Sequence, residues 1–344
     1  MSYGEHIGFD SFMAFLSVSL IVLAAVLFFL YKKRHVDQPE ESTVDVAPIT
    51  KLCACPYSLM DADAATDGFN QRRIIGKGRL GTVYAALLPS GELVAVKRIH
   101  PRLVLSNAGF GFSSTLKWLS LAHHPNLVSI LGFSEAPGER IILMEFVGGT
   151  MSLDYFLNDQ DSNKATLLDW GQRLKIVAGV ARGVEYLHEV VAPPIVHGCI
   201  KPSNVLIDVK RCARVCDYGL SFLFPFDRRG LEGYVDDEYW VERRGASKEC
   251  DVYGLGVILL ELLSGKRNGD GNLLVSWALP LIREMKFCEL LDSRLVTPSD
   301  VKPLVRLAKV ASACVGNSRK NRPSIVEVAA ILNNVEMGLS SSAT

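Results

Sequence analysis

The feature that most constrains this chain is a long apolar segment near its amino terminus. Residues 12–31 read FMAFLSVSLIVLAAVLFFLY, a run of 20 residues without a charged side chain. A helix of that length rises about 30 Å, which matches the hydrocarbon thickness of a lipid bilayer. The segment therefore predicts a single transmembrane helix at 12–31, with the bilayer as its partner.

The charges beside this segment predict its orientation. The basic cluster KKR at 32–34 follows it directly, whereas the residues before it carry only Glu5 and Asp10 as charges. Because basic flanks stay on the cytoplasmic side, residues 1–11 are expected to be a short extracellular segment. The alternative is a cleaved signal peptide, but that needs a basic leader and a shorter apolar stretch. The order of charges here favours the membrane anchor.

Composition describes the rest of the chain as a folded, intracellular body. The 37 Lys and Arg residues balance 37 Asp and Glu residues, which excludes a nucleic-acid binder that works through a globally basic surface. A hydrophobic content of 49% permits a large core. The eight cysteines are scattered and do not form a disulfide framework. Cys53 and Cys55 are expected to be free thiols, with acylation as the less favoured alternative.

Three parts are expected after the apolar segment. Residues 32–58 contain three prolines and mixed charges, which is typical of a juxtamembrane linker. Residues 59–335 carry the periodic apolar patterns of one domain. Residues 336–344 lack core residues and are expected to form a disordered tail.

Within residues 59–335 the apolar period changes from that of strands to that of helices. Alternating, β-branched segments at 73–99 and 127–146 predict an antiparallel sheet. Helical spacing begins at Trp170, and the later apolar patterns predict helices at 251–264, 272–286, 302–315 and 323–335. The second apolar run, Val252–Leu263 in the segment 251–264, is too short to span a membrane, so it predicts a buried core helix. The predicted fold class is α+β.

Two motifs in the predicted sheet point to phosphate binding. Residues 75–83 read IGKGRLGTV, a GxGxxGxV pattern whose backbone amides can approach phosphate oxygens. Alone this pattern is weak, because an ordinary hairpin can also contain glycines. The strand VAVK at 94–97 places Lys97 beside the loop, where a lysine can reach phosphates. Together the two motifs are much more specific than either one.

With these motifs the chain resembles a eukaryotic protein kinase, and specifically a plant receptor-like kinase. Further phrases support the resemblance in the same order along the chain: ATDGF at 65–69, HPNLV at 124–128, DVYGLGV at 251–257 and RPS at 322–324. The resemblance covers residues 59–335. It implies a bilobal protein-kinase-like fold, with a small antiparallel sheet lobe followed by a helical lobe.

The resemblance also implies an ATP site with Mg²⁺. The residues at the family's nucleotide-binding positions are Ile75, Gly76, Gly78, Gly81, Val83, Ala95, Lys97, Glu145, Val147 and Leu206. Asn204 in KPSN and Asp217 in DYG match the metal ligands, and two oxygen ligands suffice because Mg²⁺ keeps its own waters. The alternative interpretation of Asn204 and Asp217 is a pair of ordinary turn residues.

The parts of the family that transfer phosphate are missing. Cys199 occupies the proton-acceptor position, in HGC where the family has His-Arg-Asp, and its thiol is mostly neutral at pH 7. Loss of a general base typically costs about 10²–10⁴ in rate. Gly198 replaces the arginine that receives an activation-loop phosphate. No residue is therefore predicted to be catalytic.

The ion pair of the active state is also expected to be lost. Thr115 lies where the family has a glutamate, and no Asp or Glu occurs from residue 101 to residue 130. Lys97 is therefore expected to pair with Asp217 instead.

One further segment departs from the family pattern. Leu231 replaces the threonine that contacts the catalytic loop, and an Asp-Asp pair at 236–237 replaces Ala-Pro. Glu238 remains, and it is expected to form a buried pair with Arg322 that preserves the fold.

Taken together, the sequence predicts a membrane-anchored receptor-like pseudokinase that binds ATP and acts as a signalling scaffold or allosteric partner of other membrane receptor kinases. Family analogy places it in the plasma membrane, with the kinase-like domain in the cytoplasm. One alternative is an active atypical Ser/Thr protein kinase. Another is a structural anchor that binds no nucleotide, because Arg79 and Leu80 at the tip of the glycine loop crowd the phosphates.

Overall fold

The structure, a computed structural model, describes residues 53–106, 111–158, 167–223, 230–241, 246–268 and 273–342. These residues belong to one compact unit, 51–344. The predicted extracellular segment, the apolar run at 12–31 and most of the predicted linker lie outside the described residues. Over the described ranges, no helix is both long enough and apolar enough to cross a membrane.

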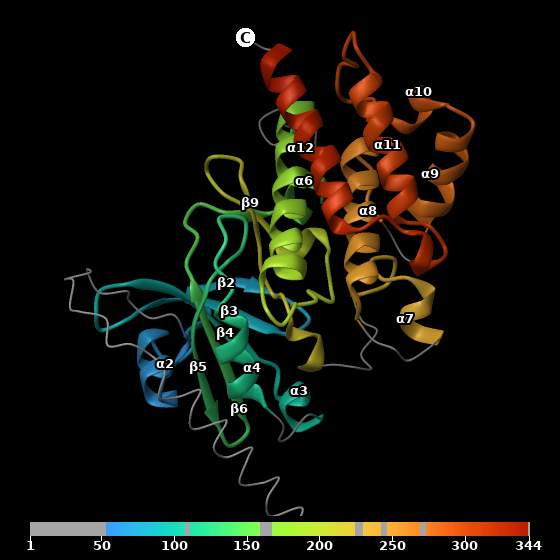
Figure 1. Cartoon of the computed structure of the whole chain (residues 1–344). Helices are drawn as coiled ribbons and strands as arrows, with labels where there is room; N and C mark the ends of the chain where they lie inside the picture. The colour runs from blue at the N-terminus through green and yellow to red at the C-terminus, as the bar shows by residue number, and fades with distance from the viewer. Residues whose placement is uncertain are drawn as a thin grey trace, which may run out of the picture. The chain divides into compact units, whose positions relative to one another are not determined.

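A six-stranded sheet forms the first lobe (Figure 1). Its strands are β1 (Cys55–Pro56), β2 (Ile74–Lys77), β3 (Gly81–Leu87), β4 (Leu93–Ile99), β5 (Ile130–Ala136) and β6 (Glu139–Glu145), in the order β1-β5-β6-β4-β3-β2. Every pair is antiparallel except β1 with β5. The sheet predicted over 73–99 and 127–146 is therefore confirmed, with β1 as an addition.

The ordered domain begins earlier than the sequence predicted. The Ala54 N–H donates to Ser120 Oγ at 2.7 Å, and the Tyr57 N–H donates to the Phe133 carbonyl at 2.8 Å. A Cβ on Gly132 would overlap the Tyr57 ring, so glycine lets this segment lie against β5. The predicted boundary between linker and domain at residue 58 is thus too late. Two residues of strand carry no detectable period, which is why the pattern did not show it.

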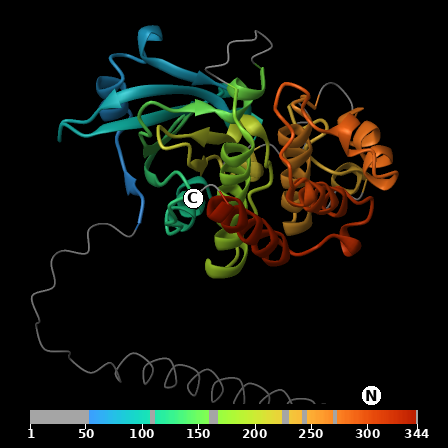
Figure 2. The same ribbon diagram turned by 90° about the horizontal axis from the view of Figure 1, so that it is seen from above.

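Helices form the second lobe, with the exception of α2, α3 and α4, which lie beside the sheet (Figures 1 and 2). The helices are α2 (Leu59–Ala65), α3 (Pro101–Ser106), α4 (Phe112–Leu119), α5 (Leu153–Asn158), α6 (Trp170–Glu185), α7 (Asp237–Val241), α8 (Lys248–Ser264), α9 (Leu273–Arg283), α10 (Phe287–Leu290), α11 (Lys302–Cys314) and α12 (Ile325–Ser342). The helical segments predicted from Trp170 onward are confirmed. However, α12 continues to Ser342, past the predicted end at residue 335.

A small second sheet lies in the helical lobe and was not predicted. It consists of β7 (Met151–Ser152), β8 (Val205–Ile207) and β9 (Ala213–Val215), in the order β7-β8-β9. Strands of two or three residues are too short to show alternation. This sheet matters for the site because β8 follows Asn204 directly and β9 precedes Asp217 by two residues.

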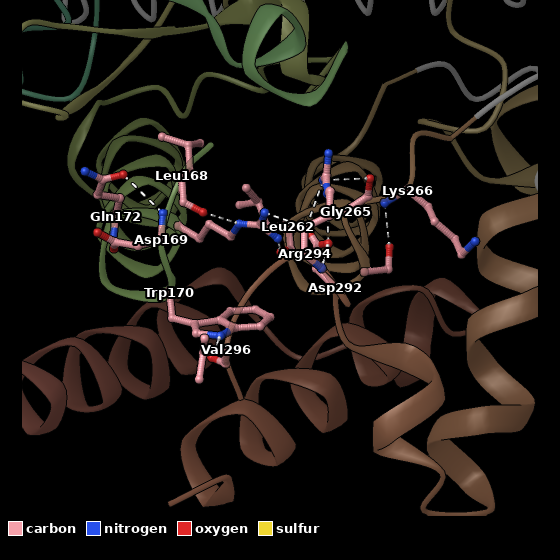
Figure 3. Close-up of polar contacts among 12 residues, drawn as sticks. Leu168, Asp169, Trp170, Gln172, Leu262, Gly265, Lys266, Asp292, Arg294 and Val296 are labelled. Atoms are coloured by element: carbon pink, nitrogen blue, oxygen red, sulfur yellow. Dashed lines mark hydrogen bonds and ion pairs between the residues drawn. The ribbon is translucent and has the colours of Figure 1, made fainter. Parts of the chain in front are cut away.

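A buried ion pair fixes α6 against the rest of the helical lobe (Figure 3). Asp169 caps α6 by accepting the Gln172 N–H at 2.8 Å. One turn later, Arg173 donates to Asp292 Oδ2 at 2.6 Å and to the Leu262 carbonyl of α8 at 2.5 Å. Both charged side chains are almost fully buried. The helix α8 is buried along nearly its whole length, as its apolar run Val252–Leu263 predicted.

Candidate functional site

A cavity of about 640 Å³ lies between the sheet and the helical lobe. All of the nucleotide and metal positions predicted from the sequence line it: Ile75, Gly76, Gly78, Gly81, Val83, Ala95, Lys97, Glu145, Val147, Asn204, Leu206 and Asp217. They come from β2, β3, β4, the end of β6, the β8 region and the turn after β9. The fold therefore brings together residues that are up to 142 positions apart in the sequence.

Two glycines of the glycine loop differ in what surrounds them. Gly81 is required by the protein itself, because a Cβ there would overlap the Arg98 carbonyl of β4. Gly78 differs: its N–H donates to the Gly81 carbonyl at 2.9 Å, and nothing lies within 4 Å of the place where its Cβ would be. The space beside Gly78 is consistent with a ligand that approaches the backbone closely.

The inner end of the cavity is apolar. Val83, Ala95 and Leu206 line it from three strands, and Met144 is buried behind them. The carboxylate of Glu145 is turned to Arg214, whose Nη2 lies 2.5 Å from it. An apolar slot of this kind suits a flat heteroaromatic ring, because burying such a ring is favourable.

At the opposite end, Lys97 forms an ion pair with Asp217, as the sequence predicted. The two side chains are only 8% and 10% exposed. Thr115 lies on α4, and among the described residues no hydrogen bond or ion pair joins Lys97 to that helix. Asp217 adopts a positive φ of 65° and lines the cavity.

Cys199 is buried in an apolar cluster and also contributes to the cavity lining. Its side chain is 5% exposed, and it packs with Leu231, Val235, Tyr239 and Cys250. Burial raises the pKa of the Cys199 thiol, and the opposing effect of nearby cations does not cancel this rise. A neutral thiol in this cluster cannot take a proton from an alcohol at neutral pH.

The sequence placed residue 231 against the catalytic loop but did not predict the apolar cluster that Leu231 shares with Cys199. A signal was available, since both positions have an apolar or neutral residue where the family has a polar one.

The backbone at Gly198 leaves no place for the family's arginine. Gly198 has a φ of +82°, and its N–H donates to Asp251 Oδ1 at 2.8 Å. A Cβ at this position would lie 2.8 Å from both Cβ and Oγ of Ser221. Asp251 also accepts the N–H of the buried His197 at 2.7 Å. Its two carboxylate oxygens thus bind two consecutive backbone N–H groups, which fixes the backbone at residues 197 and 198.

The predicted pair between Glu238 and Arg322 is wrong. Arg322 is instead bound to Asp236, which Arg319 also contacts at 2.8 Å. Burial alone raises the pKa of Asp236, but hydrogen bonds from both arginines outweigh it and hold the pKa below its usual range. Glu238 is further out, in the first turn of α7, and accepts the backbone N–H of Arg319 at 3.0 Å. Asp236, which stands where the family has alanine, therefore forms the buried ion pair with Arg322 that the sequence assigned to Glu238.

A family described as protein kinase domain matches residues 69–330. Serine/threonine-protein kinase-like protein CCR2 of Arabidopsis thaliana is 35% identical over 282 residues, which are 80% of this chain and 34% of CCR2. Cysteine-rich receptor-like protein kinase 27 of the same plant is 34% identical over 334 residues, which are 93% of this chain and 51% of that protein. The chain thus spans a third to a half of these relatives.

A solved structure is also similar over almost its full length. The pseudokinase domain of BIR2, an immune regulator of the RLK/Pelle family, is 31% identical with a TM-score of 0.69. The match covers 90% of this chain and 94% of that one.

Proposed function

Because this chain belongs to the protein kinase domain family and its relatives include receptor-like kinases, we propose that it is a membrane-anchored receptor-like pseudokinase. It binds ATP, does not transfer phosphate efficiently, and serves as a signalling scaffold or allosteric partner of other receptor kinases. The membrane anchor in this proposal rests on the apolar run at 12–31 and the basic cluster that follows it.

One observation carries the proposal: a nucleotide-sized cavity keeps the residues predicted to bind a nucleotide but has a buried thiol at the acceptor position. The cavity is lined by the full predicted set of nucleotide residues and by Cys199, which packs among apolar side chains. Phosphoryl transfer depends on positioning and on charge stabilisation rather than on covalent chemistry by the protein. A site that keeps the cradle and loses the proton acceptor supports binding without turnover.

The retained fold supports a role in assembly. The ion pairs Arg173–Asp292 and Arg322–Asp236 are buried, and each links segments far apart in the sequence. Removing one partner of such a pair usually lowers the free energy of unfolding by about 3–5 kcal/mol. Because the chain keeps both pairs, it keeps a stable fold, and a stable fold presents a defined surface to partners. The similarity to the BIR2 pseudokinase domain supports the same interpretation.

A transfer assay tests the absence of turnover. The full chain, purified in detergent micelles, is incubated with Mg²⁺, γ-labelled ATP and a generic substrate. We expect no signal above that of Lys97→Met, which removes the phosphate-contacting lysine. Robust labelling would instead support the active atypical Ser/Thr kinase.

A stability measurement tests nucleotide binding. A ligand that binds only the folded state raises the thermal midpoint, and the rise grows with ligand concentration. We expect ATP to raise the midpoint of the full chain, and Ala95→Trp, which fills the apolar end of the cavity, to abolish the rise. No shift at saturating ATP would support the structural anchor.

A third measurement tests the scaffold role. Affinity capture of the cross-linked full chain from the membranes of its native cells is expected to return a receptor kinase. Recovery of soluble proteins alone would contradict both the membrane anchor and the partner class.

A further inference from the structure

A row of cations lies on the outer side of α11. Lys302, Arg306 and Lys309 recur four and three residues apart, so they share one side of this helix. All three residues are exposed, whereas the opposite side of α11 is buried and packs against α8. None of the three lines the nucleotide cavity. These three residues form the α11 stripe.

The chain around the α11 stripe contains no acidic residue that balances it. The whole chain has a net charge of zero, yet no Asp or Glu occurs from residue 301 to residue 326. Asp300, just before α11, accepts the backbone N–H of Lys302 at 3.0 Å. Over the described residues no ion pair involves a cation of the stripe. The stripe is therefore a local excess of positive charge.

Other helices of the same lobe balance their cations. Three ion pairs show this: Arg182–Glu336, Lys248–Glu189 and Lys286–Glu284. The α11 stripe differs from these helices in charge balance and not in the kind of residue. An unbalanced row of this kind suits a partner that brings the negative charge itself.

The side chains of the stripe favour a diffuse negative surface over a protein partner. The next exposed position on the same side, one turn after Lys309, is Ala313, and the stripe contains no aromatic or large aliphatic residue. Protein interfaces are usually centred on such residues, which become buried in the complex. A straight row of long, flexible cations needs only negative charge in front of it. The anionic headgroups of a cytoplasmic leaflet supply that charge.

The proposed membrane anchor would keep the domain close to such a surface. About 20 residues separate the apolar run at 12–31 from the first described residue, Cys53. At about 3.5 Å per residue this segment can extend to about 70 Å. A flexible tether raises the effective concentration of its two ends to the order of 1 mM. Each Lys or Arg near an anionic bilayer strengthens binding about fivefold, so a tethered domain needs only a few of them.

We infer that the α11 stripe docks on the anionic lipid headgroups of the membrane that anchors the chain. The inference rests on the membrane anchor of the proposed function. Docking adds an electrostatic attachment to the apolar anchor, and it fixes which face of the helical lobe is turned to the bilayer. The stripe lies outside the cavity lining, so docking does not use the nucleotide site.

Lysine footprinting of the full chain in nanodiscs tests the inference. The nanodiscs contain phosphatidylcholine alone or with added phosphatidylserine, and an uncharged reagent acetylates exposed lysines. With phosphatidylserine we expect acetylation of Lys302 and Lys309 to slow at least about threefold. Lys117, an exposed lysine of α4, is the internal control and should not change. The protection should disappear at about 1 M salt, where the screening length is about 3 Å. Equal rates in both nanodiscs, or equal slowing at Lys117, would overturn the inference.

Charge reversal at Arg306 gives a matched test. Arg306→Glu replaces the central cation of the stripe by a charge that the lipids repel. We expect the rates at Lys302 and Lys309 to agree between the two nanodiscs within about 1.5-fold. Lys117→Glu changes the net charge by the same amount on α4, and it should leave the protection intact. Equal loss of protection in both variants would show that only net charge matters, which contradicts docking through the stripe. Thermal midpoints report that both variants are folded.

Extraction of native membranes with alkaline carbonate separates this inference from the proposed anchor. A chain released by carbonate would overturn the anchor and, with it, the inference. A chain that resists carbonate but shows no protection in phosphatidylserine nanodiscs would overturn the inference alone. Protection in native membranes that is absent from lipid-only nanodiscs would point to an acidic protein segment on the stripe, which also contradicts docking on lipid.

Discussion

The two halves of the cleft differ in what their side chains face. On the nucleotide half, Lys97 and Asp217 face a cavity, and the glycine loop leaves open space beside Gly78. On the acceptor half, Cys199 lies at the cavity lining but belongs with Leu231 to an apolar cluster. Short sequence motifs specify both halves. Only the nucleotide half keeps polar side chains at its family positions, with Lys97 and Asp217.

If this chain does not transfer phosphate, as we propose, the difference points to a changed packing of the whole acceptor region and not only to the loss of one group. The acceptor half has exchanged a charged residue for a thiol, and the neighbouring segment has adapted with Leu231. The anchor below has also changed, since Asp236 now holds Arg319 and Arg322. The apolar cluster and the Asp236 ion pairs thus stabilise the acceptor half. Returning a single family residue, such as the carboxylate at position 199, would disturb this packing.

The largest expected effect concerns the anchor of the acceptor half. Asp236→Asn leaves two arginines without a buried counter-charge, and we expect a loss of about 3–5 kcal/mol in the free energy of unfolding. Glu238→Gln is the control, because Glu238 is more exposed and mainly accepts a backbone N–H. Urea unfolding of both variants is the measurement. Equal losses would mean that Asp236 is not the main anchor.

A second effect concerns pH. Glu261 of α8 is buried, accepts the Tyr234 hydroxyl at 2.9 Å, and has a pKa that burial raises to about 7. Because its usual pKa is 4.5, its contribution to stability is complete below pH 4.5 and is lost as the pH rises through 7. We expect Glu261→Gln to be more stable than wild type at pH 8, by at most about 3 kcal/mol.

The check is the thermal midpoint of both proteins between pH 4.5 and pH 8. The wild-type profile should fall over this range relative to that of Glu261→Gln. The exposed Glu232→Gln is the control, and it should follow the wild type. Parallel profiles for wild type and Glu261→Gln would contradict a raised pKa.

A smaller effect separates crowding from backbone strain in the acceptor loop. Gly198→Ala adds a Cβ that crowds Ser221 at a φ of +82°, and we expect a loss of about 2 kcal/mol. Gly91 has the same φ but open space around it, so Gly91→Ala measures strain alone and should cost about half as much. Chemical unfolding of the two variants gives the difference. If Gly198→Ala is the milder change, the loop is less tightly packed than the structure indicates.

The smallest effect is expected on catalysis. Cys199→Asp returns the family's carboxylate, but Lys97 stays paired with Asp217 and α4 supplies no acidic partner. We expect transfer of labelled phosphate to remain at the level of the Lys97→Met control. Recovery of rates typical of protein kinases, about 1–100 s⁻¹, would contradict this prediction. It would mean that the missing carboxylate at position 199 alone prevents transfer. Circular dichroism checks that the variant is folded.

Much of the nucleotide half could be predicted from the sequence because its signals are local. The glycine loop and the Lys97 strand are short motifs, and each keeps its spacing in the fold. The pairing of Lys97 with Asp217 followed from elimination, since no acidic residue occurs between 101 and 130. The acceptor half could not be predicted equally well. Asp236 and Glu238 are two residues apart, and nothing in their local pattern says which one reaches Arg322.

The sequence by itself determined the strands and helices from apolar period, the residues available to bind phosphate, and the absence of a carboxylate at 199 and 115. Only the tertiary structure decided that Leu231 and Cys199 share one apolar cluster, that Asp236 replaces Glu238 as the anchor, and that β1 extends the sheet. The reason is physical. Period and motif spacing are properties of neighbouring residues, whereas burial, counter-charge and packing depend on segments that meet only when the chain folds.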